Sequence, residues 1–217
     1  MKILNLQKAV EMIEDGSTVM IGGFLGFGSP ETIIDELVKE AKRSLTVICN
    51  DSAFPQSGIG KLIVAKLVKK LITSHMGTNP ETQKQMIDGE LEVELVPQGT
   101  LAERIRAGGV GLGGILTPTG VGTLVQNGKK IIEVDGKKYL LELPLHADFA
   151  LLKAKKSDYL GNLSYSLTAR NFNPLMAMAA DVVIAEVEEI VPTGAIPPDE
   201  VHTPHLLVDY VVVEGRK

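Results

Sequence analysis

Glycine residues cluster where an apolar stretch ends near the N-terminus of this 217-residue chain. In VMIGGFLGFGSP the apolar run is followed by Gly22, Gly23, Gly26 and Gly28, and a helical pattern begins near Pro30. Glycine allows a ligand to approach the backbone, and N–H groups at the start of a helix attract an anion or a developing oxyanion. The spacing does not match G-x-G-x-x-G, so a tight strand-to-helix turn that binds nothing explains it equally well.

A second candidate group is the carboxamide of Gln98, in VPQGTLAERIRAGG. It follows a predicted strand and precedes a predicted helix, which is the edge where open α/β sheets bind ligands. The amide can donate to a substrate or can cap the helix, and the sequence leaves both open. The glycine-rich tract 108–122 comes next and predicts a long functional loop.

The sequence shows no self-sufficient nucleophile and no metal site. Cys49 is the single cysteine and ends an apolar stretch, so we expect a small buried side chain. The four histidines lack HExxH-type spacing, and neither a G-x-S-x-G nor a Walker A motif is present. We therefore expect no metal and no tightly bound cofactor.

The composition is that of a globular protein. Hydrophobic residues make up 44% of the chain and charged residues 23%, which predicts a single domain over residues 1–217. A net charge of -5 disfavours nucleic-acid binding, and no apolar run approaches the roughly 20 residues of a membrane span. With no signal-peptide core, we expect a cytoplasmic protein that binds neither nucleic acid nor membrane.

Alternating strands and helices must position these groups. Apolar runs predict strands over residues 17–24, 45–49, 70–75, 91–96, 147–154, 181–187 and 206–213. Helical spacing predicts helices over residues 5–16, 29–42, 79–89, 100–108 and 173–180. In the second of these, Ser29 is a candidate N-cap and Pro30 the first helical residue.

The predicted fold class is α/β. The alternation implies a layered, open, mostly parallel sheet with helices on both faces. Asn127-Gly128 and Asp135-Gly136 are hairpin turn signals, so residues 125–145 are expected to form a β-rich excursion from that pattern.

The stretch DGSTVMIGGFLGFGSP, residues 15–30, resembles the signature of the α subunits of family I coenzyme A transferases. In that signature Asp-Gly opens the strand and GGF-x-x-x-G-x-P closes the loop. The similarity covers essentially the whole chain, through VPQGTLAERIRAGG, LTPTGVGT, ARNFN, EVEEIV and HTPHLLVD. ICNDSAF and SHMGTNPETQKQM look more like the bacterial acetate or acetoacetate enzymes than like the fused mitochondrial succinyl-CoA:3-oxoacid enzymes.

The resemblance implies that coenzyme A moves between a short-chain acyl-CoA and a carboxylate, both of them substrates, through a glutamyl-CoA thioester. It places that glutamate in a β subunit, in a Glu-Asn-Gly type motif that this chain lacks. We therefore expect a hetero-oligomer, α2β2 or larger, and no transfer by this chain alone. A sugar-phosphate isomerase or deaminase of the same fold, and a non-catalytic sensor of acyl-CoA or another effector, are the alternatives.

The resemblance also implies site residues. Gln98 matches the position of an oxyanion donor, and Asn50 and Gly77 are expected in the substrate pocket. The loop expected to contact coenzyme A comprises Gly22, Gly23, Phe24, Leu25, Gly26, Phe27 and Gly28.

Overall fold

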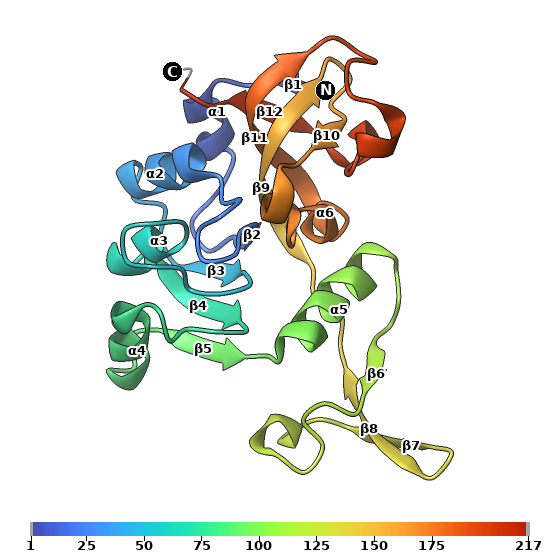
Figure 1. The fold of residues 1–217 in the computed structure, drawn as a ribbon. Coiled ribbons are helices and arrows are strands. Elements are labelled where there is room, and N and C mark those ends of the chain that lie inside the picture. The colour runs from blue at the N-terminus through green and yellow to red at the C-terminus, as the bar shows by residue number, and fades with distance from the viewer. Residues whose placement is uncertain (1, 216–217) are drawn as a thin grey trace.

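A sheet of parallel strands forms the centre of the computed structural model, which describes residues 2–215. Its order is β1 (Lys2–Ile3), β12 (Tyr210–Val213), β11 (Ala180–Val191), β9 (Ala147–Asp158), β2 (Thr18–Ile21), β3 (Leu45–Ile48), β4 (Val68–Thr73) and β5 (Glu92–Leu95) (Figure 1). Each neighbouring pair is parallel, and β10 (Leu163–Ser164) adds an antiparallel partner to β9. The predicted α/β, mostly parallel sheet is confirmed.

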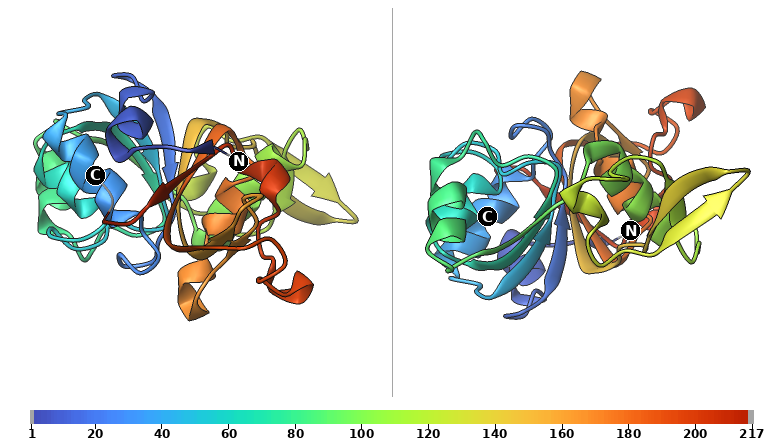
Figure 2. Two further views of the ribbon diagram at one scale, coloured as in Figure 1. Left: turned by 90° about the horizontal axis from the view of Figure 1, so that it is seen from above. Right: turned by 90° about the horizontal axis from the view of Figure 1, so that it is seen from below.

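Helices cover both faces of this sheet, as predicted (Figure 2). One face carries α1 (Leu6–Glu11), α2 (Glu31–Lys39), α3 (Gly60–Val64) and α4 (Pro80–Ile87). The other face carries α5 (Gln98–Gly109) and α6 (Asn173–Met176). Short 3-10 turns are η1 (Leu124–Gln126), η2 (Leu167–Arg170), η3 (Pro198–Glu200) and η4 (His205–Leu207). Within residues 2–215 no helix has the length and apolarity needed to cross a bilayer.

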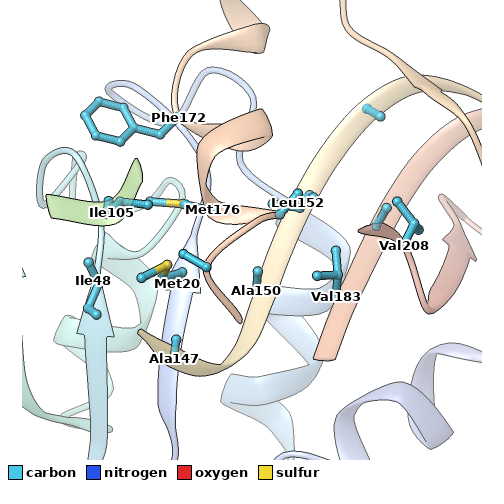
Figure 3. Packing of buried hydrophobic residues seen from close by; sticks show 14 of the residues in the cluster. Met20, Ile48, Ile105, Ala147, Ala150, Leu152, Phe172, Met176, Val183 and Val208 are labelled. Atoms are coloured by element: carbon cyan, nitrogen blue, oxygen red, sulfur yellow. The ribbon is translucent and has the colours of Figure 1, made fainter. Parts of the chain in front are cut away.

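Successive residues of the central strands enter different hydrophobic clusters, because side chains alternate between the faces of a strand. In β2, Val19 and Ile21 pack on the side of α1 to α3. Met20 points to the opposite side and joins the cluster that includes Ile105 of α5 and Met176 of α6 (Figure 3). Burial on both faces explains why the strands are continuous apolar runs.

The predicted β-rich excursion is a separate three-stranded antiparallel sheet that extends away beside α5 (Figure 1). Its order is β6 (Ile115–Thr117), β8 (Lys137–Glu142) and β7 (Ile131–Val134). Asp135-Gly136 makes the β7–β8 turn, with φ of 51° and 73°. Asn127-Gly128 lies in the connection before β7, so the hairpin expected there is wrong.

Two further local predictions are wrong. Tract 108–122 is not one long loop, because Gly108 and Gly109 complete the last turn of α5 and β6 begins at Ile115. Ser29 is not the N-cap of α2: Pro30 occupies that position without a side-chain hydrogen bond. The Ser29 side chain is buried instead, so close to Gly23 that a Cβ on Gly23 would collide with its hydroxyl oxygen.

Candidate active site

The glycine loop after β2 ends in a tight turn with two aromatic rings. Phe24 and Phe27 exchange both backbone hydrogen bonds, each at 2.9 Å. Between them, Leu25 and Gly26 have φ of 51° and 86°, the pattern of a type I′ turn. The side chains of Phe24 and Phe27 are left 44% and 70% exposed. The turn thus presents apolar surface at the tip of a buried strand.

Leu25 holds a left-handed backbone conformation that costs a non-glycine residue roughly 1–2 kcal/mol. Its N–H donates to Oδ2 of Asp51 at 2.9 Å. Asp51 follows β3 and is only 4% exposed, so the acceptor of this partly buried hydrogen bond is shielded from water. The bond to Asp51 offsets the cost of the turn and ties it to the neighbouring strand.

Packing within the chain explains several glycines of the loop. A Cβ on Gly22 would collide with Oδ1 of Asn173, and a Cβ on Gly28 would lie 2.6 Å from the carbonyl oxygen of Ala169. Asn173 in turn donates from Nδ2 to the carbonyl of Gly28 at 3.0 Å. These two positions therefore require glycine whether or not a ligand is present.

Asn171 holds both arms of the turn with one carboxamide. Its Oδ1 accepts the N–H of Gly23 at 3.1 Å, and its Nδ2 donates to the carbonyl of Phe27 at 3.0 Å. Both partners are far away in the sequence, 148 and 144 residues respectively. The segment between β10 and α6 thereby fixes the shape of the loop.

The start of α2, one of the places where the sequence allowed an external anion, is occupied by a carboxylate of the chain itself. Oε2 of Glu186 accepts the N–H of Ile33 at 3.0 Å, and Nζ of Lys153 lies 3.1 Å from its Oε1. Glu186 is fully buried. Burial raises the pKa of its carboxyl above the ordinary 4.5, since the loss of hydration outweighs the attraction of Lys153.

Gln98 is the first residue of α5, at the carboxyl edge of the sheet. Its Nε2 donates to Oδ1 of Asn50 at 2.6 Å, while the helix start has no side-chain cap. The capping alternative is therefore wrong. Asn50 follows β3, is 1% exposed, and donates from Nδ2 to Oδ2 of Asp51 at 2.6 Å. Two predicted site residues thus meet, and Asp51 connects them to Leu25 of the loop.

Gly77 lies in the next connection, between β4 and α4, and is exposed. Several hydrogen bonds join this connection to the one after β3. Among them, Thr78 Oγ1 donates to the carbonyl of Ala53 at 2.8 Å, and Ser52 N–H donates to that of His75 at 3.0 Å. Within residues 2–215 no hydrogen bond joins Gly77 to Gln98 or Asn50. The structure places it on the same edge of the sheet without bringing it to the amide pair.

Cys49 is buried, as predicted, and burial raises the pKa of its thiol. The thiol donates to the carbonyl oxygen of Asp51 at 3.2 Å, so it is a protonated core group and not a nucleophile. Among residues 2–215, no cluster of three His, Cys, Asp or Glu side chains is arranged to hold a metal ion. An open hollow of about 550 Å³ begins at Gly99, beside Gln98, and extends between α5 and β6.

Two residues of the site, Asp51 and Asn171, were not predicted from the sequence. Asp51 is next to a predicted residue, and its position directly after a buried strand is a usable signal. Asn171 lies within ARNFN, one of the stretches that resembled the family, but no local pattern indicates a partner 148 residues away.

The family model described as coenzyme A transferase matches residues 3–214, so the chain belongs to the coenzyme A transferase family. It is 54% identical to the acetate CoA-transferase subunit alpha of Escherichia coli K12, over 98% of this chain and 96% of that one. It is 52% identical to the acetoacetyl-CoA:acetate/butyrate CoA transferase alpha subunit of Clostridium acetobutylicum, over 98% of each. The predicted similarity to α subunits is confirmed.

Solved structures agree with this placement. An acyl-CoA transferase from Escherichia coli O157:H7, determined as a thioester complex with CoA, matches 98% of this chain with a TM-score of 0.88 and 27% identity. This chain spans 47% of that longer protein. Glutaconate coenzyme A-transferase from Acidaminococcus fermentans shares the fold, with a TM-score of 0.84 at 20% identity.

Proposed function

We propose that this chain is the α subunit of a heteromeric CoA-transferase. The enzyme moves coenzyme A between a short-chain acyl-CoA (acetyl-, acetoacetyl-, butyryl- or succinyl-CoA) and a carboxylate. The names of relatives that are about half identical over nearly their whole length support this proposal. A β subunit supplies the nucleophilic glutamate, in an α2β2 or larger assembly in the cytoplasm, and residues 1–217 act as one domain.

The observation that carries the proposal is the hydrogen bond between Gln98 and Asn50. An amide nitrogen has two N–H groups, and Asn50 accepts one of them at 2.6 Å. The second is held in a fixed direction on an exposed side chain at the ligand-binding edge. It suits the carbonyl oxygen of a thioester, which becomes negative when a carboxylate attacks.

The exposed turn supports a role in holding coenzyme A. Phe24 and Phe27 offer apolar surface to the thioester and its pantetheine arm, and Gly26 brings bare backbone between them. We assign the loop from Gly22 to Gly28 to this contact. Binding energy from such remote parts of the substrate can be used at the reacting centre. We assign Asn50 and Gly77 to the substrate pocket: Asn50 holds the Gln98 amide, and Gly77 lies on the exposed connection after β4.

Reconstitution tests the proposal. The chain is expressed alone and together with a β subunit that contains Glu-Asn-Gly, and the transfer of coenzyme A from acetoacetyl-CoA to acetate is measured. We expect transfer from the complex only, with loss of activity when the partner's glutamate is replaced. Turnover by the purified chain alone would refute the proposal. Binding of acyl-CoA by the complex without turnover would support the sensor alternative.

A further inference from the structure

The side chains of Asp51, Asn50 and Gln98 form a continuous line of hydrogen bonds that ends at the proposed oxyanion donor, Gln98. Oδ2 of Asp51 accepts from Nδ2 of Asn50 at 2.6 Å, and Oδ1 of Asn50 accepts from Nε2 of Gln98 at 2.6 Å. Asn50 and Asp51 are almost fully buried, whereas Gln98 is exposed. The line therefore runs from the protein interior to the site.

The chemistry of the three groups allows this line only one polarity. An ionised carboxylate can only accept hydrogen bonds, so Asn50 must turn its NH₂ group toward Asp51. Its carbonyl oxygen then points to Gln98, and Gln98 must meet it with an N–H. If either amide were reversed, two acceptor oxygens would face each other in a buried place, which is costly.

Asp51 is itself held in place from several directions. Its Oδ1 accepts the backbone N–H of Ala53 at 2.8 Å, and its Oδ2 also accepts that of Leu25 at 2.9 Å. Within residues 2–215 its carboxylate has no ion-pair partner. The three hydrogen bonds that its carboxylate accepts thus come from the loop, from its own connection and from Asn50.

We infer that Asp51 is a positioning residue that fixes, through Asn50, the direction of the Gln98 amide, so that its free N–H and not its oxygen is offered to the substrate. The catalytic consequence rests on the proposed function. The orientation of the amide does not, so the two can be tested separately.

A double-mutant cycle in the assembled enzyme tests the catalytic consequence. Asp51→Asn keeps the shape of the side chain but lets both amides reverse, so we expect kcat to fall about fivefold or more. KM for acyl-CoA should rise as well, because Oδ2 of Asp51 also accepts the N–H of Leu25 in the glycine loop. In a Gln98→Ala background the same change should alter kcat by less than about twofold, because Asp51 acts through Gln98. Equal losses of kcat in both backgrounds, or a change in KM with no loss of kcat, would overturn the inference.

Asp158→Asn is the matched control. Asp158 is also a buried aspartate whose Oδ1 accepts backbone N–H groups, of Leu160, Gly161 and Asn162, each at 3.0 Å. It is the last residue of β9, and within residues 2–215 its carboxylate has no hydrogen bond to Gln98 or to the glycine loop. We expect it to lower the melting temperature without changing kcat per folded site. A matching loss of kcat in this control would show that destabilisation alone explains the result.

Solution NMR of the ¹⁵N-labelled full chain tests the orientation without any assay of transfer. The side-chain amide signals of Gln98, identified by their loss in Gln98→Ala, should shift in Asp51→Asn and stay unchanged in Asp158→Asn. Unchanged signals in Asp51→Asn would overturn the inference whatever the kinetics. If the wild-type complex transfers no coenzyme A, the proposed function fails, and this measurement alone decides the role of Asp51.

Discussion

The carboxylate of Glu186 accepts the backbone N–H of Ile33 at 3.0 Å, across 153 residues of sequence. Glu186 belongs to β11 and Ile33 to the first turn of α2. Lys153 of β9 shares that carboxylate and also lies 2.7 Å from Glu214. A buried ion pair at the centre of the sheet thus tethers the helix that follows the glycine loop.

Breaking this pair should destabilise the chain. We expect Glu186→Ala to lower the free energy of unfolding by about 3–5 kcal/mol, because Ile33 loses its acceptor and Lys153 its buried partner. The control is Glu189→Ala on the same strand. The Glu189 side chain is 60% exposed and its carboxylate lies 3.7 Å from Lys156, so this change should lower the free energy of unfolding by less than about 1 kcal/mol. Urea unfolding of both variants measures the difference. Similar losses would contradict the tether.

The raised pKa of Glu186 makes stability depend on pH. The folded chain keeps this proton to higher pH than the unfolded chain does, so the contribution of Glu186 is largest below its ordinary pKa of 4.5 and declines as pH rises through the raised value. Relative to Glu186→Gln, which has no such proton, wild type should lose stability as the pH rises above the ordinary pKa of 4.5 and through the raised pKa of Glu186. A constant or growing difference in unfolding free energy would exclude this assignment.

Gly111 and Gly28 have similar backbone conformations, so alanine substitutions at the two positions separate the effect of backbone strain from the effect of a steric clash. Gly111 has φ of 73°, and no atom lies within 4 Å of the position that an added Cβ would take, so Gly111→Ala should lower the melting temperature by only about 2–4 °C. Gly28 has φ of 77° and the Ala169 carbonyl 2.6 Å away, so we expect Gly28→Ala to lower it at least about twice as much. Calorimetry measures the melting temperatures of the two variants. Equal decreases would mean that small movements relieve the clash with Ala169.

Removal of the Gln98 amide should affect catalysis more than folding. We expect Gln98→Ala in the assembled enzyme to lower kcat by at least about tenfold, in line with loss of a transition-state donor. The side chain is exposed, so assembly and thermal unfolding should be preserved. Gln7→Ala, which alters another exposed glutamine in the first turn of a helix, is the control. A kcat within about twofold of wild type would exclude the oxyanion role.

Loss of the Asn171 carboxamide should loosen the turn that is proposed to hold coenzyme A. In the assembled enzyme, we expect Asn171→Ala to raise KM for acyl-CoA by about fivefold or more. Asn171→Asp keeps the acceptor for Gly23 but loses the donor to Phe27, and should have a smaller effect. Asn127→Ala in the exposed connection before β7 should leave KM unchanged. If Asn171→Ala alters only the melting temperature, the turn does not need this support to bind substrate.

Local sequence signals were sufficient to predict the parallel sheet of this fold and the helices that cover it. The apolar run that contains Met20 and the helical spacing around Ile33 predicted β2 and α2, because burial on two faces and amphipathic spacing act within a few residues. The same alternation placed Gln98 at the carboxyl edge of the sheet. The hydrogen bond between Gln98 and Asn50 became visible only in the structure. The two residues follow strands β5 and β3, which lie on either side of β4 in the sheet, and the order of the strands cannot be read from a local pattern.

Local signals failed where a distant segment decides the conformation. Ser29 has the residue type of an N-cap, yet it is buried against the glycine loop and α2 begins at Glu31. The reason for Gly28 also lies far away in the sequence, at Ala169. Positions such as these follow from tertiary contacts that no window of neighbouring residues contains.

The central strand of the sheet is made late during synthesis. β9 pairs with β2 on one side and β11 on the other, with Val19 opposite Phe149. Until β9 leaves the ribosome, the nascent chain therefore holds an apolar strand, β2, with one edge unpaired. Such edges attract other chains, and parallel pairing between distant segments is slow. The order of the strands therefore leaves one edge of β2 open to other chains until the second half of the chain has been made.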